Sequence, residues 1–193
     1  MKDTAVLAQQ LESPRMWLRC PLPGDGELVH AGVLDSLASL REWPDSLPWA
    51  LNDQSVRASE DYCQTCYAAW VMRVAWPMLI FDKTSGSFMG TVGFHHMDWN
   101  RGQWELGYWC RVSFQNQGRM TEAVQTLTDA ARQAWPQMQL ISRVDKRHLA
   151  SIKVLERAGY RSVQEEALVS SSGENRVVLH YAAGRALQTG QLS

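Results

Sequence analysis

The sequence has no excess of charge of either sign and no long apolar run. Its 19 lysine and arginine residues face 20 aspartate and glutamate residues, which gives a formal net charge of -1. A protein that binds nucleic acid or an anionic membrane through its overall field needs a surplus of basic residues. No apolar run approaches the roughly 20 residues that span a membrane, and the first residues lack the apolar core of a signal peptide. We therefore expect a cytoplasmic protein with no membrane partner and no strong nucleic-acid signal.

Cysteine is scarce, and its pattern matches no disulfide or metal framework. The four cysteines, Cys20, Cys63, Cys66 and Cys110, are too few and too scattered for a disulfide scaffold. Cys63 and Cys66 form a CxxC within a segment of helical pattern, but no second CxxC or HxxxH completes a zinc site. We expect reduced, structural cysteines and no metal.

Two glycine-rich nucleotide-binding motifs are also missing. GxGxxG and GxxxxGK[ST] do not occur, which excludes a Rossmann dinucleotide site and a P-loop. The chain does place a single glycine, Gly118, where a helix should begin, in the stretch FQNQGRMTEAV. Glycine removes the Cβ that would hold an anion away from the backbone, and the first-turn amides of roughly Gln117 to Thr121 can donate to that anion. We predict a pyrophosphate site there, and a purely structural turn is the alternative.

The spacing of apolar residues predicts alternating strands and helices. We expect residues 1–193 to form one domain, with residues 184–193 a flexible tail. The expected strands are Arg15–Pro23, Pro77–Asp82, Ser87–His96, Trp104–Val112, Gln139–Val144, Tyr160–Leu168 and Arg176–Ala183. The expected helices are Leu28–Leu40, Gln54–Val74, Arg119–Ala134 and Lys146–Ala158, the last capped by Asp145 and ended by Gly159. Pro44 and Pro48 make the stretch between the first two helices a surface loop.

The order of these elements and two motifs resemble the GNAT acetyltransferases. The likeness is greatest to the RimJ/RimL-type branch, which includes ribosomal-protein-alanine N-acetyltransferases, and it spans nearly the whole chain. The family's loop [QR]xxGx[GA] is filled by Gln115, Gly118 and Met120. Its second block, NxxSxxxLxxxGF, is filled by His148, Ser151, Leu155, Gly159 and Tyr160. The resemblance implies an α+β GNAT fold, with a mostly antiparallel seven-stranded sheet flanked by about four helices.

The resemblance further implies acetyl-CoA as the cofactor, bound largely by main-chain groups. Its pyrophosphate would lie on the loop around Gly118. The donor for the reaction's oxyanion would be a main-chain N–H near Trp109 to Arg111, where the central strand parts from the next one. The residues expected to hold the cofactor are Trp109, Cys110, Arg111, Val112, Gln115, Gln117, Gly118, Arg119, Met120, Thr121, His148 and Ser151.

Two side chains are the predicted catalytic residues. Ser151 would donate a proton or hydrogen bond to the departing sulfur, and the alternative is a serine that bonds its own helix backbone. Glu105 is the predicted base, acting directly or through water. The alternatives are His95, His96, Asp98 and Glu166. Since His95 and His96 are adjacent in a strand, we expect them to face opposite sides of it.

The acceptor is expected to be a primary amine, most simply a protein or peptide N-terminus. Neutralising an α-amine of pKa about 8 costs roughly 1.4 kcal/mol at pH 7, against about 4.6 kcal/mol for lysine, so weak base assistance suits α-amines. RimJ/RimL-type enzymes typically acetylate protein N-termini. A polyamine or aminoglycoside-type acceptor is the alternative and would need clustered carboxylates, for which Asp45, Asp53, Glu60 and Asp61 are candidates. A non-catalytic acyl-CoA-binding module is a third reading, and the sequence leaves monomer or homodimer open.

Overall fold

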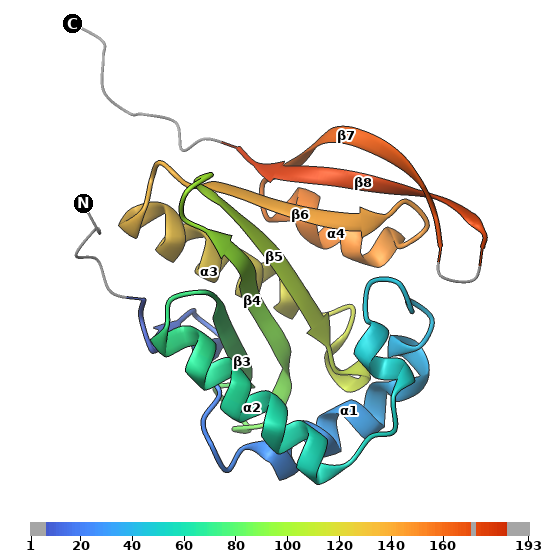
Figure 1. Cartoon of the computed structure of the whole chain (residues 1–193). Coiled ribbons are helices and arrows are strands. Elements are labelled where there is room, and N and C mark those ends of the chain that lie inside the picture. Colours follow the sequence, from blue (N-terminus) through green and yellow to red (C-terminus); the bar gives the residue numbers. More distant parts are fainter. Residues whose placement is uncertain (1–6, 171–172, 185–193) are drawn as a thin grey trace, which may run out of the picture.

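The computed structural model describes residues 7–170 and 173–184, which form one continuous sheet with helices on both faces (Figure 1). The strands are β1 Gln10–Glu12, β2 Met16–Arg19, β3 Trp76–Asp82, β4 Phe88–Asp98, β5 Gln103–Cys110, β6 Gln139–Asp145, β7 Tyr160–Val169 and β8 Asn175–Ala183. The α-helices are α1 Gly26–Leu40, α2 Val56–Val71, α3 Arg119–Ala134 and α4 Leu149–Arg157. Two 3₁₀ turns, Pro48–Leu51 and Val112–Phe114, lie in the loops before α2 and after β5.

The sheet has the order β1-β2-β3-β4-β5-β6-β8-β7, and every neighbouring pair is antiparallel except β5 and β6. The predicted mixed, mostly antiparallel sheet and the four helices are confirmed. The structure has eight strands in place of the predicted seven, because the three residues of β1 pair with β2 at the sheet edge. A strand this short carries too few residues for an alternating pattern to show.

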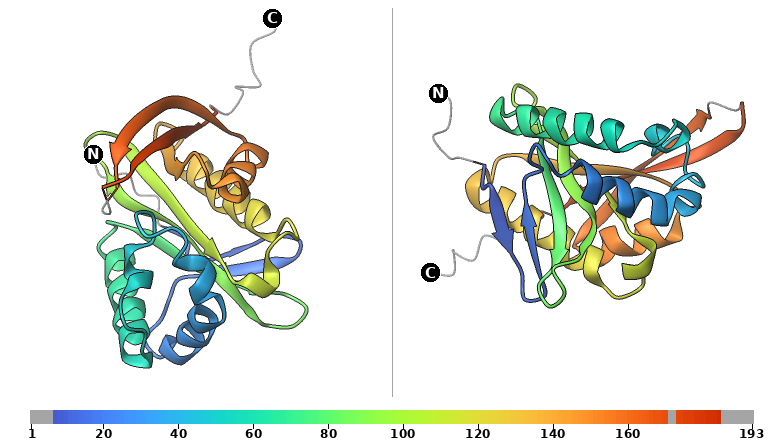
Figure 2. Two further views of the ribbon diagram at one scale, coloured as in Figure 1. Left: turned by 90° about the vertical axis from the view of Figure 1, so that its right-hand side faces the viewer. Right: turned by 90° about the horizontal axis from the view of Figure 1, so that it is seen from below.

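The helices cover the two faces of the sheet unequally. Helices α3 and α4 lie on one face and α1 and α2 on the other, as Figures 1 and 2 show. On the second face the apolar cluster under α1 joins Val29 and Val33 to Leu79 of β3 and Trp109 of β5. Within the described residues no helix covers the neighbouring strands β6, β8 and β7 on this face, and Arg143 of β6 is exposed. This uncovered half of the second face is called the open face below.

Tryptophans fix the start of β5 on the α3 side. Trp76, Trp104 and Trp135 are each at most 1% exposed. Trp104 packs edge-on against Trp135 and Trp99, with ring centroids 5.2 and 5.0 Å away. Such edge-to-face contacts add to the large apolar area that each ring buries. The beginning of β5 is therefore part of the core.

The predicted cap of α4 is wrong in detail. The Asp145 carboxylate accepts the Arg147 N–H at 2.9 Å and also binds its guanidinium. Because those bonds hold the residues after Asp145 in a turn, α4 begins at Leu149 with His148 in the N-cap position. The predicted helix end is confirmed, since Gly159 has the left-handed φ of 86° that terminates many helices.

A bulge near the end of β4 changes which side chains share a face. Opposite β5, the pairing shifts between His95 and Asp98, and His96 takes a positive φ of 49°. A bulge inserts an extra residue and breaks the alternation of the strand. His95 and His96 consequently line one cavity, so the prediction that they face opposite sides is wrong.

The cysteines are buried thiols, as predicted. Cys20, Cys63 and Cys66 are buried, and all four cysteines are free. Burial raises the pKa of the Cys63 thiol to about 12 and that of Cys66 to about 11, which makes both unreactive.

No helix in the described part of the chain combines the length and apolar character needed to cross a membrane. The predicted tail lies outside the described residues from position 185 onward.

Candidate active site

An opening forms in the sheet where β5 and β6 part. The two parallel strands pair over only three residues of each, ending at Glu105 and Ile141. Beyond that point β5 continues to pair with β4 as far as Cys110, while β6 turns toward β8. The V between them is visible in Figure 1, with α4 behind it. The split begins earlier in β5 than the predicted position near Trp109.

Main-chain polar groups of β5 point into this opening. Arg111 N–H donates to the Met89 carbonyl at 2.8 Å, and in an antiparallel strand successive residues point their polar groups to alternate sides. The polar groups of Cys110 therefore face the opening, where its carbonyl accepts from Gln115 Nε2 at 3.3 Å. Those of Tyr108 do the same.

The main-chain N–H groups that are free to bind an oxyanion differ from the predicted range, Trp109 to Arg111. The amide of Arg111 is used by β4, and that of Val112 donates to Ser36 Oγ at 2.9 Å. Tyr108 was not predicted as a donor and Cys110 was. These two amides are the ones the opening offers to an oxyanion or to the cofactor's amide groups.

The loop before α3 has the form that the sequence predicts. Gly118 has a left-handed φ of 70°, and the first helical bond is donated by Glu122 to its carbonyl. Within residues 7–170 and 173–184 no acceptor is found for the backbone N–H groups of residues 117 to 121. A Cβ at position 118 would meet nothing nearer than an Arg15 nitrogen at 3.7 Å, so the approach to these amides is open. Free amides at a helix start, together with the helix dipole, bind phosphate groups.

The two arginines beside the loop are held by carboxylates. Arg15 donates to the Gln117 carbonyl at 3.1 Å and to the Glu122 carboxylate. Arg119, predicted to hold the cofactor, forms an ion pair with Asp82 at 2.8 Å. Arg15 thus fixes the loop from the N-terminal side of the chain, and main-chain N–H groups are the donors that the loop leaves free for an anion.

Met120, at the last place of the loop motif, points away from the site. Its side chain is 7% exposed and belongs to the core cluster with Val124 and Leu127. Only its backbone takes part in the loop, so a long side chain at this position leaves the approach to the free amides clear. Thr121, one position later, is half-buried.

Ser151 meets a partner that sequence reasoning missed. Its Oγ lies 2.9 Å from the hydroxyl of Tyr108, which also lies 3.0 Å from the Ser151 carbonyl. The serine therefore bonds across the opening, from α4 to β5. Burial raises the pKa of Tyr108 well above its ordinary value, so the phenol stays protonated. The signal that could have found Tyr108 is its position in β5, two residues before Cys110 and on the same face.

His148 is covered by a residue from the loop between α1 and α2. Its ring stacks on Trp43 with centroids 3.8 Å apart and planes at 9°. Burial lowers the pKa of His148, although nearby Asp145 opposes the shift. The same loop is tied to β8 by Asp45, which lies 3.6 Å from Arg176. The loop thus covers the opening on the side of α4, at His148.

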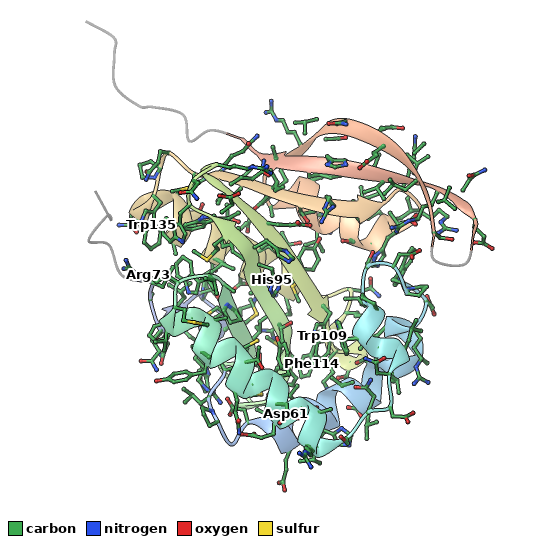
Figure 3. All side chains as sticks on the ribbon, in the orientation of Figure 1. Asp61, Arg73, His95, Trp109, Phe114 and Trp135 are labelled. Atoms are coloured by element: carbon green, nitrogen blue, oxygen red, sulfur yellow. The ribbon has the colours of Figure 1, made fainter. Side chains whose placement is uncertain are left out.

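The open face carries Glu105 and His95. Both oxygens of Glu105 accept from Arg143, at 2.8 and 3.0 Å. His95 is the direct cross-strand partner of Glu105. Figure 3 shows His95 and Trp109 on neighbouring strands beside α2. Further along the open face, Glu166 lies 2.8 Å from His180 Nε2.

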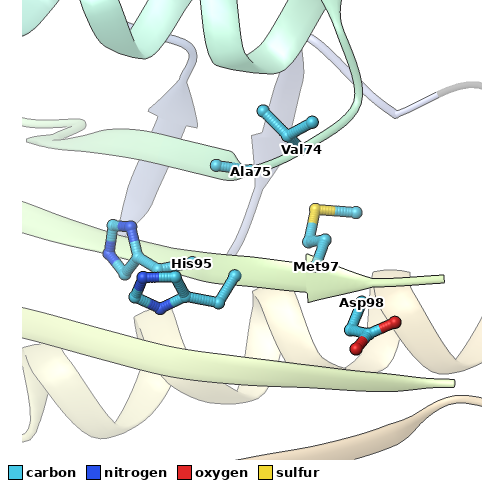
Figure 4. A pocket seen from close by; sticks show the side chains of 6 residues that line it. Val74, Ala75, His95, Met97 and Asp98 are labelled. Carbon is cyan, nitrogen blue, oxygen red and sulfur yellow. The ribbon is translucent and has the colours of Figure 1, made fainter. Parts of the chain in front are cut away.

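Two adjoining cavities lie at the bulged end of β4. The larger, of about 580 Å³, is lined by Val74, Ala75, His95, His96, Met97 and Asp98 (Figure 4). The smaller, of about 150 Å³, shares His96 and Asp98 with it and reaches Glu105 and Ile141 at the start of the opening. Together they lead from solvent to the place where β5 and β6 part.

These features fit acetyl-CoA, which supplies an activated acetyl thioester when bound. The amides of residues 117 to 121 suit its pyrophosphate, and those of Tyr108 and Cys110 lie along the opening that would take its pantetheine arm. Ser151 lies on the α4 side of the opening. Cys110 itself is a weak nucleophile, because burial raises the pKa of its thiol to about 11.

Solved structures share this fold at low sequence identity. RimL, a ribosomal L7/L12 α-N-protein acetyltransferase in complex with coenzyme A as a cysteine disulfide, is 22% identical over 92% of this chain and 97% of that chain, with a TM-score of 0.76. An acetyltransferase from Salmonella typhimurium that modifies the N-terminal serine of 50S subunit protein L7/L12 is 23% identical over 88% of this chain and 95% of that one, with a TM-score of 0.72. The microcin C7 self-immunity acetyltransferase MccE, in complex with acetyl-CoA and AMP, is 17% identical over 88% and 92%, with a TM-score of 0.77.

The family is decided by sequence. No curated protein matches the chain. A family model described as the acetyltransferase (GNAT) domain matches residues 15–161, which include the opening, the loop before α3 and all of α4. The chain therefore belongs to the GNAT acetyltransferases and is an N-acetyltransferase that uses acetyl-CoA.

Proposed function

We propose that the enzyme acetylates the α-amine of a protein or peptide N-terminus. The observation that carries this proposal is that the carboxylates around the open face already have partners. The pairs are Glu105 with Arg143, Asp98 with Arg101, Asp145 with Arg147, Asp45 with Arg176, and Glu166 with His180. A singly charged or neutral amine on an otherwise uncharged backbone suits such a face better than a polycation does.

The carboxylates that a polyamine would need do not gather. Glu60 accepts the backbone N–H groups of Gly24 and Gly26 and so serves the start of α1. Asp45 is taken by Arg176, and neither cavity is lined by Asp53 or Asp61. The alternative small-amine acceptor therefore has no specific observation in its favour.

The strength of the base also favours an α-amine. The open face offers a carboxylate that is already tied to an arginine, and two histidines that line the cavity. An α-amine needs about 3 kcal/mol less than lysine to become neutral at pH 7. Modest assistance is enough for the first amine and costly for the second.

In this proposal the two sides of β5 have different tasks. On the α4 side, Ser151 donates a proton to the departing sulfur, and the hydrogen bond between its Oγ and the Tyr108 hydroxyl holds the serine in place. On the open face, Glu105 keeps the acceptor side of the site in position through Arg143. The amides of Tyr108 and Cys110 stabilise the oxyanion between them.

The names of similar structures support the acceptor. Two of them, RimL and the Salmonella typhimurium enzyme, are named for acetylating ribosomal protein L7/L12. An enzyme that acts on such N-termini works where ribosomal proteins are made, so the proposal includes the cytoplasmic location that the sequence predicts.

A thiol-release assay with acetyl-CoA tests the acceptor. Two peptides of one sequence are compared, the first with a free α-amine and no lysine, the second with a blocked N-terminus and one lysine. Spermidine and an aminoglycoside complete the set. We expect turnover on the first peptide, with mass spectrometry placing the acetyl group on its N-terminus. Turnover on the small amines with none on either peptide would displace this acceptor.

A further inference from the structure

We infer that His95 accepts the proton that the attacking amine loses, from a position for which the bare backbone of Gly107 leaves room. The inference deepens the proposed function, because it assigns the acceptor-side proton in that reaction. It assigns to His95 the role that the sequence alone gives first to Glu105.

The His95 ring lies over Gly107. A Cβ built on Gly107 would be 3.0 Å from His95 Cδ2 and 3.3 Å from Nε2, so any side chain there would press on the ring. Gly107 is the second residue after the last β5–β6 pair and immediately precedes Tyr108, whose polar groups face the opening. His95 Nε2 therefore lies at the narrow end of the opening, on the face opposite Ser151.

A ring nitrogen of His95 is available to accept a proton, whereas both carboxylate oxygens of Glu105 are already hydrogen-bonded. Both Glu105 oxygens accept from the Arg143 guanidinium in a two-point contact, and a proton arriving there would break that pair. No hydrogen-bond partner for the His95 ring is found among the residues that the structure describes. Solvent reaches the ring from the cavity that it lines, which gives the proton a way out.

The surroundings favour the neutral form of His95. Although the residue is exposed to the cavity, desolvation by the protein around the ring lowers its pKa, His96 adds to the shift, and Glu105 opposes it. The other charged groups on its side are Asp98, which is paired with Arg101, and Arg143 beyond Glu105. From the segment between α2 and β3, the cavity is lined by Val74 and Ala75, which are uncharged. A neutral imidazole is the form that can take a proton.

The protons balance across the two faces of β5. The neutral amine nitrogen forms a bond to the acetyl carbon, and the carbon–sulfur bond breaks. The surplus proton on nitrogen goes to His95 Nε2, while the Ser151 hydroxyl gives one to the sulfur. His95 then releases its proton to water in the cavity, and the serine regains one from solvent. No other reactant is required.

The test is the pH dependence of kcat for His95→Asn and, as its matched comparison, His96→Asn. At saturating acceptor, kcat reports groups in the enzyme–substrate complex. For the unmodified enzyme we expect kcat to rise with pH through a pKa below 6.5. His95→Asn should lose that limb and lower kcat about 100-fold at pH 7. His96→Asn should keep it at a somewhat higher pKa, because a neighbouring positive charge is gone. A limb that survives in His95→Asn, or disappears in His96→Asn, overturns the inference.

A second variant tests the position of the His95 ring separately from the folding of the protein. Gly107→Ala leaves His95 intact but pushes on its ring, so we expect kcat to fall about tenfold with unchanged acetyl-CoA affinity by calorimetry. Thermal unfolding of all three variants shows whether they fold. Unchanged kcat in folded Gly107→Ala argues against the assigned position. If only a small amine is acetylated, the acceptor proposal fails, and the profiles are recorded with that amine, so the two failures remain distinct.

Discussion

The two ends of β5 differ in what surrounds them. At its start, Trp104 is fully buried among other tryptophans and the strand is paired on both sides, with β4 and with β6. At its end, Cys110 is paired only with β4, and its other side faces the opening. The start of β5 is thus part of the packed core, and its end presents main-chain polar groups to the opening. The difference arises because β6 leaves after three residues.

The fold leaves main-chain N–H groups of β5 free to bind a ligand while the strand itself stays intact. Buried N–H and C=O groups normally have partners, and a strand that loses its neighbour has unsatisfied ones. The start of β5, which pairs with both neighbouring strands and is called its sealed end below, keeps the exposed donors at the other end in place. Substitutions at the sealed end should therefore affect stability, and those at the open end should affect acetyl-CoA binding or turnover.

The largest effect is expected at the sealed end. Trp104→Ala removes a fully buried ring and should lower the free energy of unfolding by about 3–5 kcal/mol. Urea unfolding measures the change. The same substitution at half-buried Trp43 is the control and should cost much less. Similar losses at both positions would show that the start of β5 is no more rigid than a surface loop.

The next effect concerns the anion site. Gly118→Val puts a branched side chain at a left-handed φ in front of the free amides, and should raise the KM for acetyl-CoA about 10- to 100-fold through lost phosphate contacts. Gly86→Val is a matched control, because Gly86 has a φ of 69° in a turn with open space around it. Equal KM values for the two variants would remove the loop's assigned role.

A smaller effect is expected at the opening. Ser151→Ala should lower kcat about tenfold with little change in acetyl-CoA affinity, because the proton for the sulfur then comes from water. Tyr108→Phe should lower kcat less, since the serine keeps its hydroxyl and loses only the bond that holds it. Stopped-flow or steady-state thiol release gives both rates. A larger effect from Tyr108→Phe would make the phenol the direct donor.

The smallest effect belongs to the stack of Trp43 on His148. Since the pKa of His148 is lowered in the folded state, its contribution to stability is present above pH 6.5 and is lost as pH falls through the folded pKa. Trp43→Ala should cost about 1 kcal/mol at pH 7 and flatten that pH dependence. Urea unfolding at pH 7 and pH 5 measures both, and an unchanged slope would mean that other groups cause it.

Much of the site could be predicted from neighbouring residues in the sequence. The turn at Gly118 and the free amides after it follow from one glycine before an amphipathic helix, and the structure has both. The core-facing side chain of Met120 follows from the same helical stripe. The bulge that joins His95 and His96 could not be predicted, since the pattern of apolar residues does not show which position of a strand is inserted.

By itself the sequence determined the order of helices and strands and the glycine turn with free main-chain amides before α3, because both depend on residues within a few positions of one another. Only the tertiary structure decided which side chains meet across the opening. Tyr108 and Ser151 are 43 residues apart, and their contact exists because β5 and α4 are packed on the two sides of the split. The seat of the His95 ring on Gly107 likewise depends on strand register, which no single stretch of sequence fixes.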